Sequence, residues 1–182
     1  PAFLQFGLKG EGIHGRIEDV RVGESGKRLT RYHLTLVPAL YYLQYSVNQR
    51  IFQHLTVPQI IAQVLKGHGI QAHAYRFHVN KSPEREYCTQ YGENDFEFIQ
   101  RLCSEDGISW HHQHSAQDHL LVFTEDQTFF PKLGTTQYQP GNGLVADCPV
   151  VSQFSVRFSS RTTTTTRRSY DLKRPSLLLE SQ

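Results

Sequence analysis

The sequence predicts an α+β fold. Two segments carry the 3.6-residue apolar spacing of amphipathic helices, and the segments around them alternate apolar and polar residues as half-buried strands do. The order along the chain is strands, helix, strand, helix, hairpin and further strands. Because strands and helices do not alternate regularly, this order favours an α+β fold over a doubly wound parallel sheet.

The composition is that of a globular protein. The chain has 182 residues, of which 38% are hydrophobic and 20% charged, enough for one sizeable core or two small domains. Its formal net charge of +2 is too small to require nucleic acid or an anionic membrane as a partner. We find no signal peptide and no run of about 18 apolar residues that would anchor the chain in a membrane. The sequence contains no methionine, so we expect it to be a piece of a longer protein.

The first 50 residues are expected to be mainly β-structure. Residues 13–22 and 28–40 alternate apolar and polar side chains, and the segment GESGK at 23–27 predicts the turn of a hairpin between them. Within the second strand, one face is apolar and consists of Tyr32, Leu34 and Leu36. The aromatic run YYLQYSV at 41–47 predicts a continuing strand.

The first helix is predicted to begin at Val57. Thr56 is a suitable N-cap, Pro58 fits the first turn, and Gly67 or Gly69 can end the helix. The apolar stripe consists of Val57, Ile60, Ile61, Val64 and Leu65.

The second helix lies in an acid-rich stretch, residues 90–107. Asn94 is a suitable N-cap, with Glu97 three residues later as in a capping box, and Gly107 can end the helix. Arg101 can pair with Glu97 across one turn. The apolar stripe consists of Phe96, Ile99, Leu102 and Cys103. The acids are therefore interpreted as structural, water-facing residues, and a catalytic carboxylate pair is disfavoured.

A short strand at 73–79 precedes the second helix, and a hairpin at 107–126 follows it. The strands of the hairpin are 107–114 and 119–126, joined by the loop Ser115–Asp118. Its buried root is expected to consist of Trp110, Leu121 and Phe123.

Three histidines of this hairpin suggest a metal site as the main alternative to a purely structural hairpin. With that loop, His114 lies opposite His119, and His112 shares their face of the sheet. Three converging imidazoles could bind a zinc or nickel ion, but the sequence fixes no fourth ligand. We therefore expect a polar, solvated hairpin tip without a metal, and we keep a metal site of His112, His114 and His119 as the alternative.

Two other patterns have structural interpretations. The segment Gly141–Ala146 has the spacing GxGxxA, but neither the strand nor the helix of a dinucleotide site flanks it, so a loop is expected. Cys88, Cys103 and Cys148 lack CxxC spacing and are expected to be buried thiols rather than disulfides or zinc ligands.

The C-terminal segment is basic and prone to form strands. Residues 150–158 and 161–172 are rich in β-branched residues and predict two strands. The basic cluster consists of Arg161, Arg167, Arg168, Lys173 and Arg174. Because aromatic residues are sparse there, a solvated or partner-facing strand is favoured over a nucleic-acid site.

Several short motifs follow one another in a recognisable order. They are HGRI at 14–17, RIFQ at 50–53, REY at 85–87, QYGENDFEFIQRLCSEDGISWHH at 90–112 and SYDLKRPS at 169–176. Together with the helix from Val57, they resemble the VgrG family, the spike proteins of the bacterial type VI secretion system. The resemblance covers nearly the whole chain in order and spacing. Cys103 and Ser104 depart from the pattern, since the family more often has acidic residues there.

This resemblance implies an α+β fold like that of phage tail hubs. It implies a β-barrel-type portion at 1–48, an inserted portion with two helices and a hairpin at 49–127, and a β-rich return segment at 128–182. The expected role is a structural part of the secretion spike, with no catalytic residue and no cofactor.

The resemblance also implies partners. The full-length protein is expected to form a homotrimer, to dock on the hexameric Hcp tube, to support a needle and to carry effectors or adaptors. It would assemble in the bacterial cytoplasm and then be secreted into the medium or a target cell. A baseplate hub of a contractile phage is the nearest alternative. A metal-dependent enzyme that uses the histidine hairpin is the alternative from another class.

Overall fold

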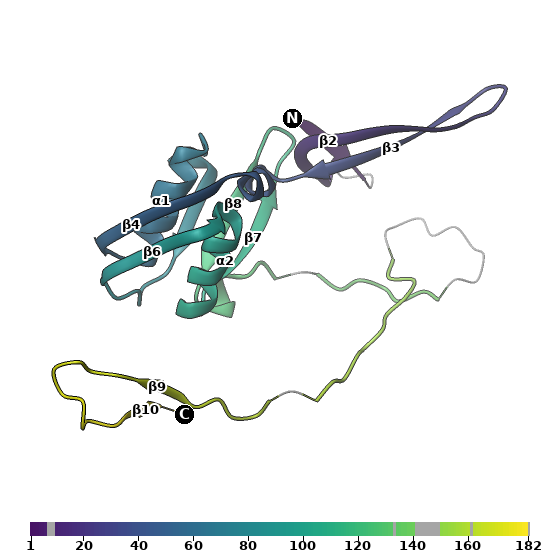
Figure 1. Ribbon diagram of the computed structural model, residues 1–182. Coiled ribbons are helices and arrows are strands. Elements are labelled where there is room, and N and C mark those ends of the chain that lie inside the picture. The colour runs from purple at the N-terminus through teal and green to yellow at the C-terminus, as the bar shows by residue number, and fades with distance from the viewer. Residues whose placement is uncertain (7–9, 133, 141–149, 161, 182) are drawn as a thin grey trace. The chain divides into compact units, whose positions relative to one another are not determined.

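The computed structural model describes residues 1–6, 10–132, 134–140, 150–160 and 162–181. The chain forms two compact units, Pro1–Gly134 and Thr135–Gln182, which are described separately (Figure 1).

The first unit holds both α-helices and most of the strands. In chain order its elements are β1 (Ala2–Gln5), β2 (Gly12–Ser25), β3 (Thr30–Val37), the 3-10 helix η1 (Ala39–Tyr45), β4 (Val47–Leu55), α1 (Val57–Gly67), the 3-10 helix η2 (Ala72–Ala74), β5 (Tyr75–His78), β6 (Arg85–Asn94), α2 (Asp95–Asp106), β7 (Ser109–His114), β8 (His119–Thr124) and the 3-10 helix η3 (Gln127–Phe129). Its sheets have the strand orders β1-β2-β3, β4-β6 and β5-β8-β7. The β5–β8 pair is parallel and the other pairs are antiparallel. The predicted α+β class is confirmed, and in the described part of the chain these sheets stay open rather than closing into a barrel.

The β2–β3 hairpin forms where the sequence predicts it and extends away from the helices as a ribbon (Figure 1). Residues 12–15 of β2 pair with β1, whereas residues 16–25 pair with β3. The apolar face predicted for β3 is present and is doubled by β2 in the cross-strand pairs Ile17–Leu36, Val20–Leu34 and Val22–Tyr32. We call these side chains the ribbon face. The four side chains nearest the tip of the ribbon are 55–66% exposed: Val20, Val22, Tyr32 and Leu34. The ribbon face is therefore apolar but lies in solvent.

The aromatic run at 41–47 does not form the strand that its composition predicts. Residues Ala39–Tyr45 instead form η1, which buries Leu40 and Leu43 completely or nearly so. Side chains three residues apart lie on one side of a 3-10 helix, so this spacing lets both leucines enter the core. Burial of these leucines outweighs the β-propensity of the neighbouring tyrosines.

Helix α1 begins and ends where the sequence predicts. The Thr56 hydroxyl accepts a hydrogen bond from the Gln59 N–H, and the Gln59 side chain accepts one from the Thr56 N–H, which satisfies two free donors of the first turn. The helix ends at Gly67. Its fully buried residues are the predicted stripe, Val57, Ile60, Ile61, Val64 and Leu65.

Helix α2 has the predicted caps but a different buried face. The Asn94 side chain accepts from the Glu97 N–H at 2.8 Å, and Gly107 ends the helix in the left-handed conformation with φ of 69°. Its buried apolar residues are Phe98, Ile99, Leu102 and Cys103. Phe96, which the predicted stripe included in place of Phe98, is only half-buried.

The predicted ion pair between Arg101 and Glu97 is wrong. The Arg101 guanidinium donates to the carboxylates of Glu93 at 2.6 Å and Glu105 at 3.0 Å. Glu105 also accepts from Arg85 of β6 at 2.6 Å. The Arg101–Glu105 pair has the i,i+4 spacing that a helix pattern can show, whereas the Arg85–Glu105 contact cannot be read from the helix, because Arg85 lies in a strand 20 residues away.

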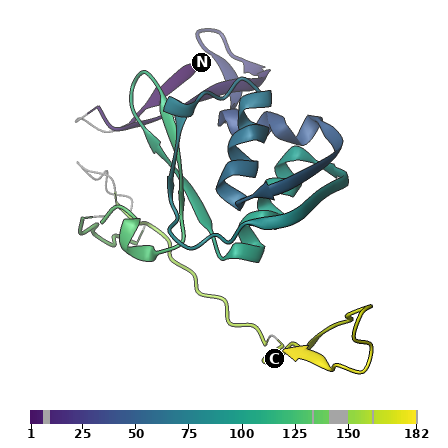
Figure 2. The same cartoon turned by 90° about the vertical axis from the view of Figure 1, so that its left-hand side faces the viewer.

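One hydrophobic core joins the two helices to the strands beside them (Figure 2). Phe77 of β5 stacks on Phe123 of β8 with ring centroids 4.8 Å apart. Leu121 and Phe123 are buried, as predicted for the root of the hairpin, and Trp110 packs half-buried at the edge of the core. Each large apolar side chain buried in this way stabilises the fold by about 1.5–3 kcal/mol.

The second unit contains one short antiparallel pair, β9 (Arg167–Ser169) and β10 (Leu179–Ser181). The strand predicted at 150–158 is wrong, because its described residues make only an isolated bridge from Val151 to Tyr138. Within the described residues 162–172, only β9 is a strand. The predicted loop at Gly141–Ala146, and also Cys148 and Arg161, lie outside the described residues.

Among the described helices, none is both long enough and apolar enough to span a bilayer.

Candidate functional site

Two clusters of polar side chains lie inside the first unit. The first surrounds Asp95, the first residue of α2, whose side chain is only 1% exposed. Its carboxylate accepts hydrogen bonds from four side chains, Arg50 and Asn48 of β4, Gln90 of β6 and His68 after α1. The sequence suggested that the acids of this helix face water, and for Asp95 that expectation is wrong.

The surroundings of Asp95 hold it in the charged form. Burial alone would raise its pKa, but hydrogen bonds from Arg50, Gln90, His68 and Asn48 outweigh burial and lower the pKa below its usual value. Every oxygen is directed at protein donors, so the carboxylate links α2 to β4 and β6 and offers no free face to a substrate. This cluster is therefore structural.

The second cluster consists of histidines. The predicted register of the hairpin is confirmed, with His114 of β7 opposite His119 of β8. His112 lies on the same face, with its ring centroid 6.0 Å from that of His114 and 5.5 Å from that of His119. The expectation of a solvated tip is wrong for His119, which is 8% exposed.

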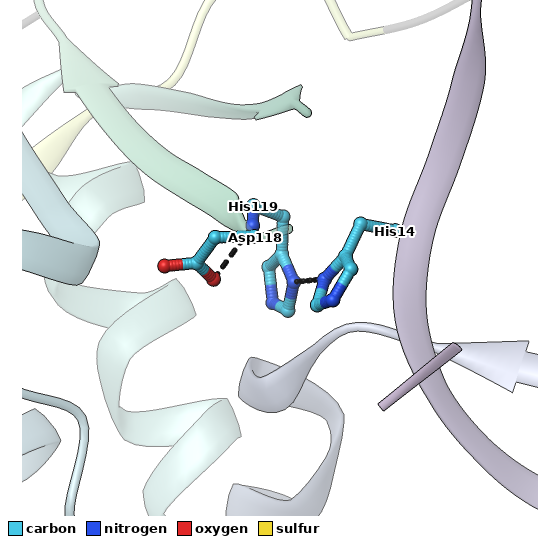
Figure 3. Close-up of side chains that lie close together, drawn as sticks. All are labelled: His14, Asp118 and His119. Atoms are coloured by element: carbon cyan, nitrogen blue, oxygen red, sulfur yellow. Dashed lines mark hydrogen bonds between the residues drawn. The ribbon is translucent and has the colours of Figure 1, made fainter. Parts of the chain in front are cut away.

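A fourth imidazole, His14 of β2, completes the cluster. Its Nδ1 lies 3.0 Å from Nδ1 of His119, and His14 itself is 7% exposed (Figure 3). The two residues are 105 positions apart, so no local pattern could have paired them. The only hint was the alternation in 13–22, which places His14 on one face of its strand.

The hydrogen bonds of His119 fix its tautomer. Its Nε2 lies 3.1 Å from the backbone N of Ala39, and a peptide N–H can only donate. Nε2 of His119 must therefore carry a lone pair, and in the neutral ring Nδ1 carries the proton. That proton is donated to Nδ1 of His14, so neutral His14 carries its own proton on Nε2.

His114 contacts the backbone of β2, the strand that carries His14. Its Nδ1 lies 3.3 Å from the backbone N of His14 and 3.1 Å from the backbone O of His14. A neutral His114 can accept from the N–H, and a protonated one can donate to the carbonyl. This exposed ring therefore keeps a partner in either charge state.

His112 is the least satisfied member of the cluster. Its buried Nε2 has no hydrogen-bond partner among the described residues. Burial, reinforced by the neighbouring His119, His114 and His111, lowers the pKa of His112 from 6.5 to about 4. The ring is therefore neutral at physiological pH.

Three members of the cluster, His14, His112 and His119, line a cavity of about 730 Å³. Other polar residues on its walls are Arg16, Gln71, His73, Gln117 and Asp118.

The contacts of His119 oppose metal binding through its Nδ1. The side chains whose ligand atoms come within 4.8 Å of one another are His14, Asp118 and His119, a different set from the predicted His112, His114 and His119. A His119 ring that bound a cation through Nδ1 would carry its proton on Nε2, and that proton would point at the N–H of Ala39. The hydrogen bonds instead suit a pair of neutral rings that joins β2 to the hairpin.

Comparison with known proteins extends over the whole chain. Residues 4–182 match the family model described as phage tail baseplate hub (GPD). The chain is 60% identical to the type VI secretion system spike protein VgrG4b of Pseudomonas aeruginosa, over 100% of this chain and 23% of that protein. It is 35% identical to the spike protein VgrG3 of Vibrio cholerae, over 90% of this chain and 16% of that protein. The chain thus spans less than a quarter of the length of these relatives.

A relative with a different name matches this chain about as closely as VgrG3 does. The actin cross-linking toxin VgrG1 of Vibrio cholerae is 34% identical over 90% of this chain, which covers 15% of that protein. The matching part is therefore shared between proteins that are named for different activities.

A solved structure agrees with these matches. The E. coli c3393 protein, described as a component of the type VI secretion system with structural similarity to the T4 bacteriophage tail proteins gp27 and gp5, superposes with a TM-score of 0.65. It is 25% identical, and the match covers 92% of this chain and 43% of that one. The chain therefore belongs to the phage tail baseplate hub (GPD) family, and along its length it is similar to VgrG spike proteins.

Proposed function

We propose that this chain is a non-enzymatic part of the hub of a type VI secretion spike, and that its longer protein works as a homotrimer. The observation that supports this most directly is the exposed ribbon face. A two-stranded ribbon is at best marginally stable in water, and this one extends three cross-strand apolar pairs beyond the core. Such a face is suited to packing against a neighbouring subunit.

The β-barrel expected of the hub is part of the same proposal. The sheet β1-β2-β3 is open, so its free edges are available to strands from elsewhere in the assembled hub. In this proposal residues 1–48 supply the barrel portion, residues 49–127 form the inserted portion, and residues 128–182 return to the barrel.

The role in secretion follows from the family. The assembled hub would dock on the hexameric Hcp tube and support a needle with its effectors or adaptors. It would assemble in the bacterial cytoplasm and leave the cell through the type VI apparatus. A phage baseplate hub is the alternative role for the same architecture. A metal-dependent enzyme built on the histidine hairpin is disfavoured by the hydrogen bonds of His119.

Light scattering on two proteins tests the trimer. We expect the isolated 182-residue chain to be mainly monomeric at micromolar concentration and the longer protein to be a trimer. Obligate interfaces commonly bury about 2,000 Å² or more, whereas the ribbon face consists of the side chains of three cross-strand pairs. A stable trimer of the isolated chain would contradict the first expectation, and a monomeric longer protein would contradict the family role.

Paired substitutions on the two faces of the ribbon test the interface. Val20→Glu with Leu34→Glu places charges on the ribbon face, and Arg21→Glu with His33→Glu makes the same change at the adjacent cross-strand pair on the opposite face. We expect the first pair to weaken trimerisation and co-sedimentation with Hcp tubes, and the second to leave both intact. All four side chains are exposed, so circular dichroism of the isolated chain should not change. Equal effects of the two pairs would exclude the ribbon face as the interface.

A further inference from the structure

We propose that His14 and His119 form an acid-sensitive latch, which holds β2 firmly against the β7–β8 hairpin when both rings are neutral and loosens that contact when either ring gains a proton. This inference concerns the isolated fold and does not depend on the proposed role in secretion.

The latch is a directed chain of hydrogen bonds. The Ala39 N–H donates to Nε2 of His119 at 3.1 Å, and Nδ1–H of His119 donates to Nδ1 of His14 at 3.0 Å. Ala39 opens η1, His119 opens β8 and His14 lies in β2, so two bonds join three elements. Because the first donor is a peptide N–H, the direction of the chain cannot reverse.

A single added proton breaks this chain. If Nε2 of His119 is protonated, it faces the Ala39 N–H, and two donors meet without an acceptor. If Nδ1 of His14 is protonated, it faces Nδ1–H of His119 with the same result. Both rings are more than nine-tenths buried, so water cannot readily replace the lost partner. The protonated state is therefore favoured only where the protonated ring has left this chain of hydrogen bonds.

The groups around His119 mostly oppose its protonation. Burial lowers its pKa first, the nearby rings of His14 and His114 and the charge of Arg16 lower it further, and the Asp118 carboxylate acts in the opposite direction. Other titratable groups that line the same cavity are His112 of β7, His73 of η2, Tyr42 of η1 and the N-terminal amine of Pro1. Apart from Asp118, these neighbours would all be neutral or positive on acidification, so protonation of the pair is accompanied by repulsion within the cluster.

His114 differs from the buried pair because its protonation costs no hydrogen bond to β2. Its exposed ring can exchange an acceptor role toward the His14 N–H for a donor role toward the His14 carbonyl, at 3.3 and 3.1 Å. Protonation of His114 therefore keeps one hydrogen bond to β2, whereas protonation of His14 or His119 loses one. Acid should weaken the contact through the buried pair while His114 stays bound to the backbone.

The latch connects two sheets of the first unit. His14 lies in the sheet β1-β2-β3, and His119 lies in the sheet β5-β8-β7. These sheets share no strand. Opening of the latch would let the ribbon and β1 move relative to the hairpin without unfolding α1 or α2.

Amide hydrogen exchange of the 182-residue chain in EDTA buffer tests the latch. After correction for the pH dependence of intrinsic exchange, we expect protection of the Ala39 amide to fall by roughly tenfold or more between pH 7.5 and pH 5, as one hydrogen bond is lost. The amides of Ile61 in α1 and Ile99 in α2 should keep their protection over the same range. Equal protection of Ala39 at the two pH values would overturn the proposal, as would a parallel loss at Ile61 and Ile99.

A double variant separates the latch from general acid sensitivity. The variant carries His119→Gln together with His14→Asn. The amide oxygen of the glutamine replaces the accepting Nε2 of His119, and that of the asparagine replaces the accepting Nδ1 of His14. Neither new side chain can be protonated in this pH range. We expect Ala39 to remain protected at pH 5 in this variant, while His33→Gln, a change to an exposed ribbon histidine, should behave like the original chain. Loss of Ala39 protection at pH 5 in the double variant, to the same extent as in the original chain, would refute the latch.

The tautomers provide a test that needs no variant. Nitrogen-15 chemical shifts of the histidine rings at pH 7.5 should show the proton on Nδ1 of His119 and on Nε2 of His14. The opposite assignment for His119 would overturn the proposal even if the variants fail to fold.

Discussion

The guanidinium of Arg50 on β4 forms an ion pair with the buried carboxylate of Asp95, 45 residues later in the chain, at the first turn of α2. Asp95 is 1% exposed, and the Arg50 side chain is 31% exposed. A carboxylate at a helix N-terminus usually acts on the helix dipole from the surface. Here it also joins a strand, a helix and a loop within the core.

Asp95→Asn should therefore strongly destabilise the fold. The substitution removes the charge that compensates Arg50 and places an NH₂ group among donors, and breaking a buried ion pair costs about 3–5 kcal/mol. Urea unfolding followed by circular dichroism measures the loss. Glu97→Gln, an exposed change in the same helix, should stay within about 0.5 kcal/mol of the original chain. A comparable small effect of Asp95→Asn would show that the pair is not formed.

Ile61→Asp should unfold the first unit. Ile61 is fully buried in the stripe of α1, and an unpaired charge there costs several kcal/mol against a total stability of about 5–15 kcal/mol. Thermal melting followed by circular dichroism measures the effect. Gln63→Asp, on the exposed face of the same helix, should melt nearly as the original chain does. If Ile61→Asp melts cooperatively at an unchanged temperature, the assignment of α1 to the core is wrong.

His112 should make the fold less stable in mild acid. Its pKa is lowered from 6.5 to about 4, so the unfolded chain binds a proton that the folded chain resists. His112 therefore does not reduce the free energy of unfolding above pH 6.5. This free energy falls as the pH drops toward 4, by about 2 kcal/mol at pH 5. Urea unfolding at pH 7 and pH 5 should show a smaller decrease for His112→Leu than for the original chain. The exposed His33→Leu should not change the decrease, and a His112→Leu protein with the full decrease would assign it to other groups.

The chain should bind no stoichiometric zinc. The tautomer that Ala39 imposes on His119 opposes metal binding through Nδ1. Elemental analysis after dialysis of chelator-treated protein against zinc measures this directly. A stoichiometric ion that is lost in a His112→Ala, His114→Ala double variant would contradict the expectation and support the metal-dependent alternative.

Local patterns in the sequence predicted the helices and the hairpin well. The stripe of Val57, Ile61 and Leu65 and the caps at Thr56 and Asn94 depend on neighbours within about two turns, which a sequence displays directly. The register of His114 with His119 followed from the length of the loop.

What the sequence could not show are contacts between distant segments. Asp95 looks like any capping acid until Arg50 is placed beside it, and His14 looks like one polar residue of a ribbon until the hairpin reaches it. The run at 41–47 does not form the predicted strand, because a 3-10 helix lets Leu40 and Leu43 pack into the core. Intrinsic β-propensity does not include such tertiary packing. The sequence correctly predicted that Tyr32, Leu34 and Leu36 share an apolar face, but it could not show that β2 extends this face or whether another subunit covers it.

The uncovered ribbon has a consequence for handling the free chain. Only β3 pairs with the outer part of β2, so its tip can open without disturbing the core, and Lys27 and Arg28 lie in the exposed turn there. Trypsin should therefore cut the free chain at this tip, as well as in the exposed C-terminal segment that carries Arg157 and Lys173, and leave both helices on one piece. A subunit packed against the ribbon face would hold the strands together and slow the cut at this tip, so the digestion pattern alone would report whether a given preparation is assembled.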